Sequence, residues 1–359
     1  MSEKPDDALV QRLLEVLNDG QRDATYKLAL LLAIIEWVTT NSGGETIPTA
    51  DLAEIVLRLY FRQIRQFPQS AGESATLKQG SSPSLRITNA VIGLVSTTPN
   101  MNRPDLVRAK NPEGFKRAVL EIEKALVEQP IPRFQIVGKD EIPFLYEWDW
   151  SPKQTLGPIK KAGKDHLALL PGVRDRLVTL GPLLRPIIEQ FWVWDVAKWT
   201  KIETEESRLR EHLFGTKRVA FPQSIVDGLK TIQGGKCFYC AGSVLSGAQV
   251  DHFVPWSVFP NDAIDNLVLS CKQCNGKKSD HLAALKYLSS WLERSPIELE
   301  KVAQSGDWEV NPKRAQAIAT NIYETLSVGS VVWAGGDGFV RLDTSDLSEI
   351  RALFNNQES

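Results

Sequence analysis

The sequence predicts a mostly helical α+β protein whose strands are short and few. Apolar residues recur at helical spacing over much of the first 225 residues, for example at Leu28, Leu31, Leu32 and Ile35. Short apolar runs that suit strands are confined to a few places. All four cysteines lie near the C-terminal end, around two such runs and the start of a helix. We therefore expect a long helical region and a small cysteine-framed α+β domain.

Composition places the chain among ordinary globular proteins of two or three domains. It has 359 residues, of which 42% are hydrophobic and 24% charged. The formal net charge of −2 lacks the positive excess of many duplex-binding proteins, so contacts with DNA would depend on local basic patches. The apolar run 28–35 is far shorter than a membrane span, and the N-terminus has no signal-peptide pattern. We expect a cytoplasmic protein without membrane association.

Five segments are expected along the chain. Residues 69–84 are rich in glycine and serine, which is typical of a flexible linker or loop. The runs 134–137 and 144–146 resemble a β-hairpin across a polar turn. The expected segments are 1–68, a helical N-terminal region; 69–84, the linker or loop; 85–225, a helical domain with a hairpin near 133–150; 226–295, the cysteine-framed domain; and 296–359, a helical extension with a short hairpin.

The cysteines form two CxxC pairs, Cys237 with Cys240 and Cys271 with Cys274. Two residues between thiolates allow a tight turn to present both sulfurs to one tetrahedral ion, and a second pair completes the site. A site closed by four sulfurs leaves no position for water, so the expected ion is a structural Zn²⁺. Dithiol redox chemistry would be the alternative, but the thioredoxin-like βαβ context is missing from the sequence.

Residues able to hydrolyse a phosphodiester lie between and beside these cysteines. Asp251 and His252 fall in an apolar run typical of a strand, Asn266 begins a second run, and Asn275 lies in the first turn of a helix expected to continue through residue 285. A neutral imidazole suits a general base, since histidine titrates at about 6.5. Asp251 and Asn275 offer hard oxygen ligands for Mg²⁺, with Mn²⁺ as the alternative. Asn266 is expected to orient the imidazole.

The motifs CFYC, VDHFVPWS and DNLVLSCKQCNGKKSDHL together resemble the HNH (ββα-metal) endonuclease domain. The resemblance is to the four-cysteine version, in which asparagine replaces the final histidine of the motif. The resemblance covers residues 237–282. It implies a ββα-metal fold, Asp251 and Asn275 as ligands of the catalytic cation, His252 as general base and Asn266 as its orienting residue. It also implies 5′-phosphate and 3′-hydroxyl products. Lys277 and Lys278, on the first helical turns, are expected to contact the DNA backbone.

A looser similarity to bacterial HNH proteins with a helical N-terminal region implies restriction or anti-phage defence, as a homodimer or with a partner subunit. Two alternatives stay open: a non-catalytic zinc-stapled DNA-binding or scaffold protein, and a toxin-like RNase. Retention of Asp251, His252 and Asn275 favours an enzyme over the scaffold. Metal-phosphate chemistry does not itself select DNA over RNA. No GxxxxGK[ST] loop occurs, so ATP use by this chain is not expected.

Overall fold

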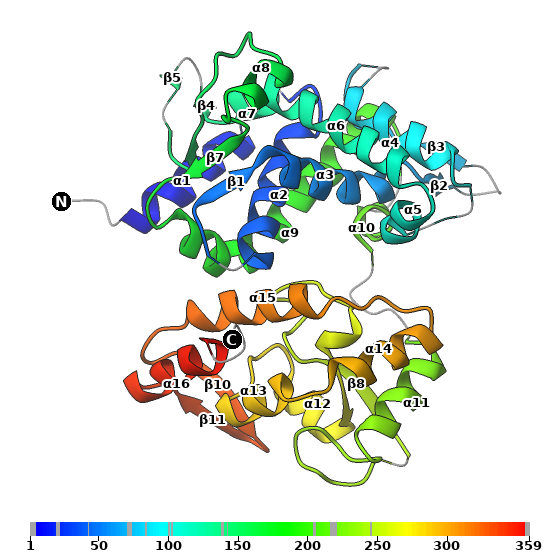
Figure 1. The fold of residues 1–359 in the computed structure, drawn as a ribbon, viewed down its shortest axis with the longest axis vertical. Coiled ribbons are helices and arrows are strands. Elements are labelled where there is room, and N and C mark those ends of the chain that lie inside the picture. Colours follow the sequence, from blue (N-terminus) through cyan, green and yellow to red (C-terminus); the bar gives the residue numbers. More distant parts are fainter. Residues whose placement is uncertain are drawn as a thin grey trace. The chain divides into compact units, whose positions relative to one another are not determined.

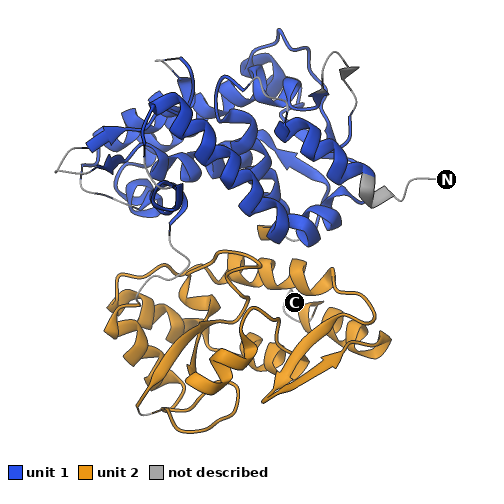
Figure 2. Ribbon diagram, turned by 180° about the vertical axis from the view of Figure 1, so that it is seen from behind, with its two compact units in different colours: residues 1–38, 43–216 blue, residues 39–42, 217–359 orange. Residues whose placement is uncertain are grey.

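The computed structural model divides the chain into two compact units, residues 1–38 with 43–216 and residues 39–42 with 217–359 (Figure 2). The structure describes residues 5–18, 22–41, 43–69, 74–82, 85–99, 101, 103–137, 140–141, 143–203, 206–215, 221–244 and 246–355. The first unit unites the two helical segments that were expected to be separate. The second unites the cysteine-framed domain with the C-terminal extension.

The first unit is mainly helical (Figure 1). Its helices are α1 (Pro5–Asn18), α2 (Tyr26–Thr40), α3 (Thr49–Gln63), α4 (Arg86–Ser96), α5 (Pro104–Lys110), α6 (Pro112–Glu128), α7 (Pro130–Arg133), α8 (Leu156–Lys161), α9 (Val173–Thr200) and α10 (Glu206–Phe214). Its strands are β1 (Thr46–Pro48), β2 (Gln66–Pro68), β3 (Ser74–Thr76), β4 (Ile136–Val137), β5 (Asp140–Glu141), β6 (Tyr146–Glu147) and β7 (His166–Leu169).

Helix α2 lies in the core of this unit because it is apolar on all sides. Residues 28–35 are each at most 1% exposed, as expected for a helix without a polar face. Helix α6 packs against both α3 and α4 and buries Phe115, Ile122 and Leu126. In the described part of the chain, every helix is too short or too polar to cross a bilayer.

The hairpin expected near residues 133–150 takes a different form. β4 pairs with the adjacent β5, whereas β6 pairs with β7 in the antiparallel sheet β1-β7-β6. The side chain of Gln135 takes the place of the expected backbone pairing. Its Oε1 accepts from the N–H groups of residues 144, 145 and 146 at 2.8, 2.7 and 3.2 Å. Local apolar alternation predicts a strand but does not identify its partner. Residues 138 and 139 of the expected turn lie outside the described residues.

The segment 69–84 was expected to be a flexible linker or loop; its described part belongs to the first unit. β3 pairs with β2, and the following Leu77 and Gln79 are 3% and 1% exposed. Gln79 satisfies buried donors: its Oε1 accepts from Trp192 Nε1 at 2.8 Å, and its backbone oxygen accepts from Thr25 N at 3.0 Å. Buried polar groups need such partners, so a polar residue can belong to the core. Residues 70–73, 83 and 84 lie outside the described residues.

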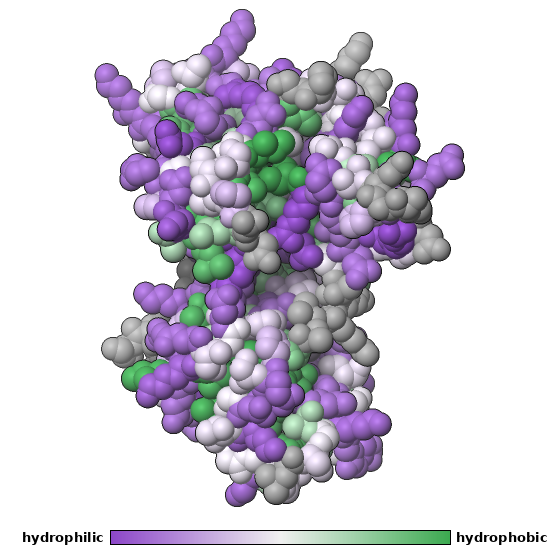
Figure 3. All heavy atoms as spheres, turned by 90° about the vertical axis from the view of Figure 1, so that its right-hand side faces the viewer, coloured by the Kyte–Doolittle hydropathy of each residue, from purple (hydrophilic) through white to green (hydrophobic). Residues whose placement is uncertain are grey.

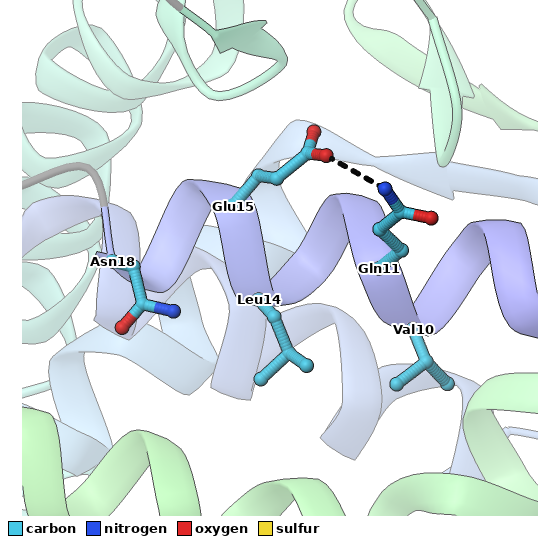
Figure 4. A pocket seen from close by; sticks show the side chains of 5 residues that line it. All are labelled: Val10, Gln11, Leu14, Glu15 and Asn18. Atoms are coloured by element: carbon cyan, nitrogen blue, oxygen red, sulfur yellow. Dashed lines mark hydrogen bonds between the residues drawn. The ribbon is translucent and has the colours of Figure 1, made fainter.

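A hollow of about 530 Å³ lies beside α1 (Figure 4). Its lining residues are Val10, Gln11, Leu14, Glu15 and Asn18. Gln11 donates to Glu15 at 3.3 Å, and Leu14 is 39% exposed. These residues do not form a catalytic or metal-binding set. On the face shown in Figure 3, the surface is mostly hydrophilic, and apolar residues gather in smaller groups.

The second unit contains a small strand pair surrounded by helices (Figure 1). Its elements are α11 (Gln223–Ile232), β8 (Ala248–His252), the 3-10 turn η2 (Ile264–Asn266), β9 (Leu267–Cys271), α12 (Lys272–Lys278), α13 (Leu285–Leu292), α14 (Pro296–Ser305), α15 (Pro312–Glu324), β10 (Val331–Gly335), β11 (Gly338–Arg341) and α16 (Thr344–Asn355). β10 and β11 form an antiparallel hairpin.

Residues 296–359 pack onto the cysteine-framed core. Helix α14 contacts both α11 and η2. Gly228 of α11 lies so close to Val302 of α14 that a Cβ at this position would collide with the valine. The backbone N–H of Ile264 also donates to Glu309 O at 2.9 Å. These contacts explain why the expected boundary at residue 295 does not separate two units.

Candidate metal centre and nuclease site

The two cysteine pairs come together in one cluster. The four sulfur atoms lie within 4.8 Å of one another, and the Sγ atoms of Cys240 and Cys271 are 3.9 Å apart. A tetrahedral zinc with Zn–S bonds of about 2.3 Å separates its sulfurs by about 3.8 Å. The cluster therefore fits a structural metal ion such as zinc, as the spacing predicted.

Local structure delivers each pair to the cluster. Cys237 and Cys240 lie in a tight turn where Ala241 N donates to Cys237 O at 2.9 Å, and Ala241 takes a left-handed φ of 55°. Cys271 ends β9 and caps α12, where its sulfur accepts from Cys274 N at 3.4 Å. Burial raises the pKa of the Cys271 thiol, but hydrogen bonds from Cys274 and the neighbouring thiols lower it overall, to about 7.

β8, β9 and α12 form a ββα unit beside this cluster. The antiparallel register pairs Asp251 with Val268 and His252 with Leu267. Helix α12 follows β9 without a loop, and the cysteine cluster joins the end of β9 to the helix. The helix ends at Lys278 instead of continuing through residue 285 as expected, because Ser279 adopts a φ of 47° that is incompatible with a right-handed helix.

Asp251 is buried at the end of a short hydrogen-bond network. Its Oδ2 accepts from the hydroxyl of Tyr239 at 2.6 Å and lies 3.2 Å from the ammonium group of Lys278. Tyr239 belongs to the first CxxC pair, so the cysteine turn directly supports this carboxylate. Burial, and secondly the Asp251 carboxylate, raises the pKa of Tyr239 well above its ordinary value. The hydroxyl therefore stays protonated and donates to the carboxylate.

Lys278 was expected to contact the DNA backbone, and its position corrects that expectation. Its side chain is fully buried, and Nζ donates to His252 O at 2.8 Å as well as pairing with Asp251. A buried, paired ammonium is not available to a phosphate. Lys277 is different, because it is 29% exposed and pairs with Asp337, an 87% exposed residue in the β10–β11 turn, at 3.0 Å.

Replacing Lys278 with methionine is expected to destabilise the ββα unit. Removing one partner of a buried ion pair leaves the other charge uncompensated, at a cost of about 3–5 kcal/mol. Hydrogen exchange of the β8 and β9 amides in the full chain should report a loss of this size. The matched control is Lys272→Met, an exposed lysine on the same helix, whose protection should stay within about 0.5 kcal/mol of wild type. Equal protection in both variants would contradict the structural role of Lys278.

His252 lies half-buried between aromatic rings. Its ring centroid is 5.7 Å from that of Phe221 and 5.4 Å from that of Trp256. Its Nε2 lies 2.8 Å from Oδ1 of Asp262, in the loop between the two strands. The candidate base is therefore held by a carboxylate on one ring nitrogen and by aromatic side chains around the ring.

Asn266 was expected to orient the imidazole, but its side chain bonds to the backbone of the neighbouring loop instead. It is 1% exposed; its Oδ1 accepts from Val254 N at 2.9 Å, while its Nδ2 donates to Val254 O and Asn261 O, each at 3.0 Å. These bonds join both ends of the loop that follows β8. An amide can donate and accept at once, which suits paired backbone groups. Asn266 thus holds the loop next to His252, whereas Asp262 contacts the ring.

Asn275 lies over the face of β8 that carries Asp251. Its Nδ2 donates to Gln249 Oε1 at 2.9 Å, and side chains two residues apart on a strand point to the same face. The hydrogen bond of Asn275 uses its nitrogen, and the contacts of Asp251 with Tyr239 and Lys278 both use Oδ2. The Oδ1 atoms of the two side chains are therefore the atoms that could bind a cation. Carboxylate and amide oxygens are the donors that Mg²⁺ prefers, so this pair fits a hard cation in chemistry.

Sequence reasoning missed three supporting residues: Tyr239, Asp262 and Arg294. Arg294 is half-buried and donates to Leu267 O at 2.7 Å and to Asp265 O, which fixes the turn before β9. Burial lowers its pKa to about 10, so it remains charged at neutral pH. The positions of Tyr239 inside a CxxC pair and of Asp262 four residues before Asn266 were available signals. Arg294, in the turn between α13 and α14, had none.

Comparisons with known proteins agree with this geometry. Residues 243–284 match the protein family described as HNH endonuclease. The chain is also 30% identical over 88 residues to the Septu protein PtuB of Bacillus thuringiensis, a match that covers 23% of this chain and 34% of that protein. The chain thus spans about a third of this relative's length. No solved structure gave a significant match. The second unit therefore carries an HNH domain, framed by a four-cysteine cluster that is placed to bind a metal ion.

Proposed function

We propose that the second unit hydrolyses DNA phosphodiester bonds with the help of a divalent cation and leaves 5′-phosphate and 3′-hydroxyl ends. The observation that carries the proposal is the ββα unit, which presents Asp251 and His252 on β8 and Asn275 on the adjoining helix within the segment that matches HNH endonucleases. Zinc on the four cysteines would have a purely structural role, because its coordination is complete.

The residues divide the chemistry between them. His252 accepts a proton from the attacking water. Asp251 and Asn275 would hold Mg²⁺ or Mn²⁺, which when bound stabilises negative charge on the phosphate and the leaving oxygen. Asn266 keeps the loop beside His252 in place. Lys277 binds a backbone phosphate after releasing Asp337, an exposed pair that contributes little to stability.

The proposed setting is restriction or anti-phage defence in a bacterium, where the chain acts as a homodimer or with a partner subunit. The match to a bacterial Septu protein supports this setting. One HNH site cuts one strand at a time, so a second copy would allow both strands of a duplex to be cut.

The test uses the purified full chain with supercoiled plasmid, linear duplex, single-stranded DNA and RNA, each with Mg²⁺, with Mn²⁺ and with EDTA. We expect cation-dependent cutting of DNA. The new ends should accept a kinase label only after phosphatase treatment and should be extended by a polymerase. Asp251→Asn should lower the rate by at least roughly 100-fold, because the hard anionic ligand is lost.

The matched control is Asp280→Asn, which removes an exposed carboxylate just beyond α12 and should leave the rate unchanged. Cutting of RNA without DNA would replace the proposal with the toxin-like RNase. DNA binding with no cutting of any substrate would replace it with the scaffold protein.

A further inference from the structure

The contact between Asp262 and His252 points to a role for the carboxylate. Asp262 Oδ1 lies 2.8 Å from Nε2 of the imidazole, and the two side chains are 26% and 16% exposed. We propose that Asp262 is a positioning residue that fixes the tautomer and the orientation of His252. This inference rests on the proposed function, in which His252 is the general base.

Asp262 is held in place from both sides along the backbone. Its carbonyl oxygen accepts from Trp308 Nε1 at 2.6 Å. Before it, Asn261 O accepts from Asn266 Nδ2, and after it, Ala263 N donates to Asn261 Oδ1 at 3.2 Å. Three hydrogen bonds, two of them from residues outside this loop, thus define where Asp262 lies. The backbone on both sides of Asp262 is therefore fixed, and the carboxylate that it carries lies against the imidazole.

The aromatic residues around His252 restrict the orientation of the ring plane, but they do not determine which ring nitrogen carries the hydrogen. Phe221 and Trp256 lie against the imidazole, and Phe221 is itself packed against Trp308. The hydrogen bond to Asp262 distinguishes Nδ1 from Nε2.

The chemistry of the two groups sets the direction of the bond. An ionised carboxylate can only accept hydrogen bonds, so Nε2 must carry the hydrogen. Nδ1 of the neutral ring is then without a proton and can accept one from water. Without Asp262 the neutral ring would divide between two tautomers, and one of them presents no acceptor at the reactive position.

The experiment compares Asp262→Asn with wild type in the full zinc-loaded chain. An amide can donate as well as accept, so it no longer selects one tautomer. We expect kcat for DNA cleavage to fall by roughly 100-fold or more, and KM for DNA to change less than about threefold. Asp262→Glu, which keeps the carboxylate, should recover part of the lost rate. Asp227→Asn, an exposed carboxylate on α11, is the matched control and should match wild type.

A second readout needs neither DNA nor the catalytic cation. Two-bond ¹H–¹⁵N correlation spectra of histidine-labelled protein, recorded where imidazole is neutral, should show the Nε2–H tautomer of His252 in wild type. Asp262→Asn should show a mixture. The His252→Ala spectrum identifies the signal.

The two proposals fail in different ways. An unchanged tautomer and rate in Asp262→Asn, with cleavage still lost in His252→Ala, would overturn the inference about Asp262 alone. A lower rate with an unchanged tautomer would also overturn it, because the residue would then support only the loop. Full activity of His252→Ala would instead overturn the proposed function.

Discussion

Substitution of Cys274 with serine is expected to abolish zinc binding and unfold the ββα unit of the full chain. Structural zinc sites contribute about 10–16 kcal/mol of binding free energy that is coupled to folding, which is as large as the whole stability of a typical domain. The paired strands are five residues each, and α12, which carries both Cys274 and Asn275, has seven. Such elements are not stable in isolation. Loss of one ligand should therefore cost most of the local structure.

Zinc content and hydrogen exchange measure this outcome. Wild type should contain close to one zinc per chain, and Cys274→Ser far less. Amides in residues 237–278 should lose protection, whereas those of α2 and α3 in the first unit should keep theirs. The matched control is Gln273→Ser, an exposed position between two ligands, which should retain both zinc and protection. Full protection of zinc-free Cys274→Ser would show that the cluster does not hold the fold together.

Unfolding of the cluster should also disturb the nuclease site through Tyr239. This residue lies within the first CxxC pair and donates to Asp251 Oδ2 at 2.6 Å. One hydrogen bond therefore joins the first cysteine turn to Asp251, the proposed ligand of the catalytic cation. Zinc removal should consequently lower the affinity for Mn²⁺ as well as stability.

The cysteine cluster could be predicted from the sequence because its geometry is local. Two residues between cysteines favour a turn that presents both sulfurs to one ion, and a second such pair completes the four-ligand site. The strand positions of Asp251 and His252 followed from the apolar run around them, and the structure places both at the end of β8. Short-range patterns were sufficient for these elements.

The partners of the polar residues could not be predicted in the same way. Lys277 and Lys278 look alike in the sequence, but successive helical residues point about 100° apart, so they face different surroundings. One pairs with Asp337 and the other is buried against Asp251, over distances that no local pattern encodes. Similarly, Asn266 looked like a partner for the imidazole, but the loop after β8 brings Val254 and Asn261 to it instead.

The first unit shows the same limit at larger scale. The Gly- and Ser-rich composition of residues 69–84 indicates a flexible linker or loop, but the side chain of Gln79 in that segment is buried and bonds to Trp192, 113 residues away. Whether a polar side chain lies in solvent or in the core depends on the donors that the fold brings to it. Local sequence patterns do not identify these donors, because they come from residues that are far apart in the chain.

Replacing His252 with alanine is expected to lower the rate of DNA cleavage by about 10²–10⁴-fold without loss of DNA binding, because a general base acts in the chemical step. Zinc content should remain at the wild-type level, since the cluster does not involve this residue. Free imidazole should restore part of the rate by occupying the space between Phe221 and Trp256. The matched control is His281→Ala, a histidine of the same unit that bonds to Lys278 O, and it should cut at close to the wild-type rate. Equal cleavage by the two alanine variants would exclude His252 as the base, whereas selective loss and imidazole rescue would locate proton transfer at this side chain.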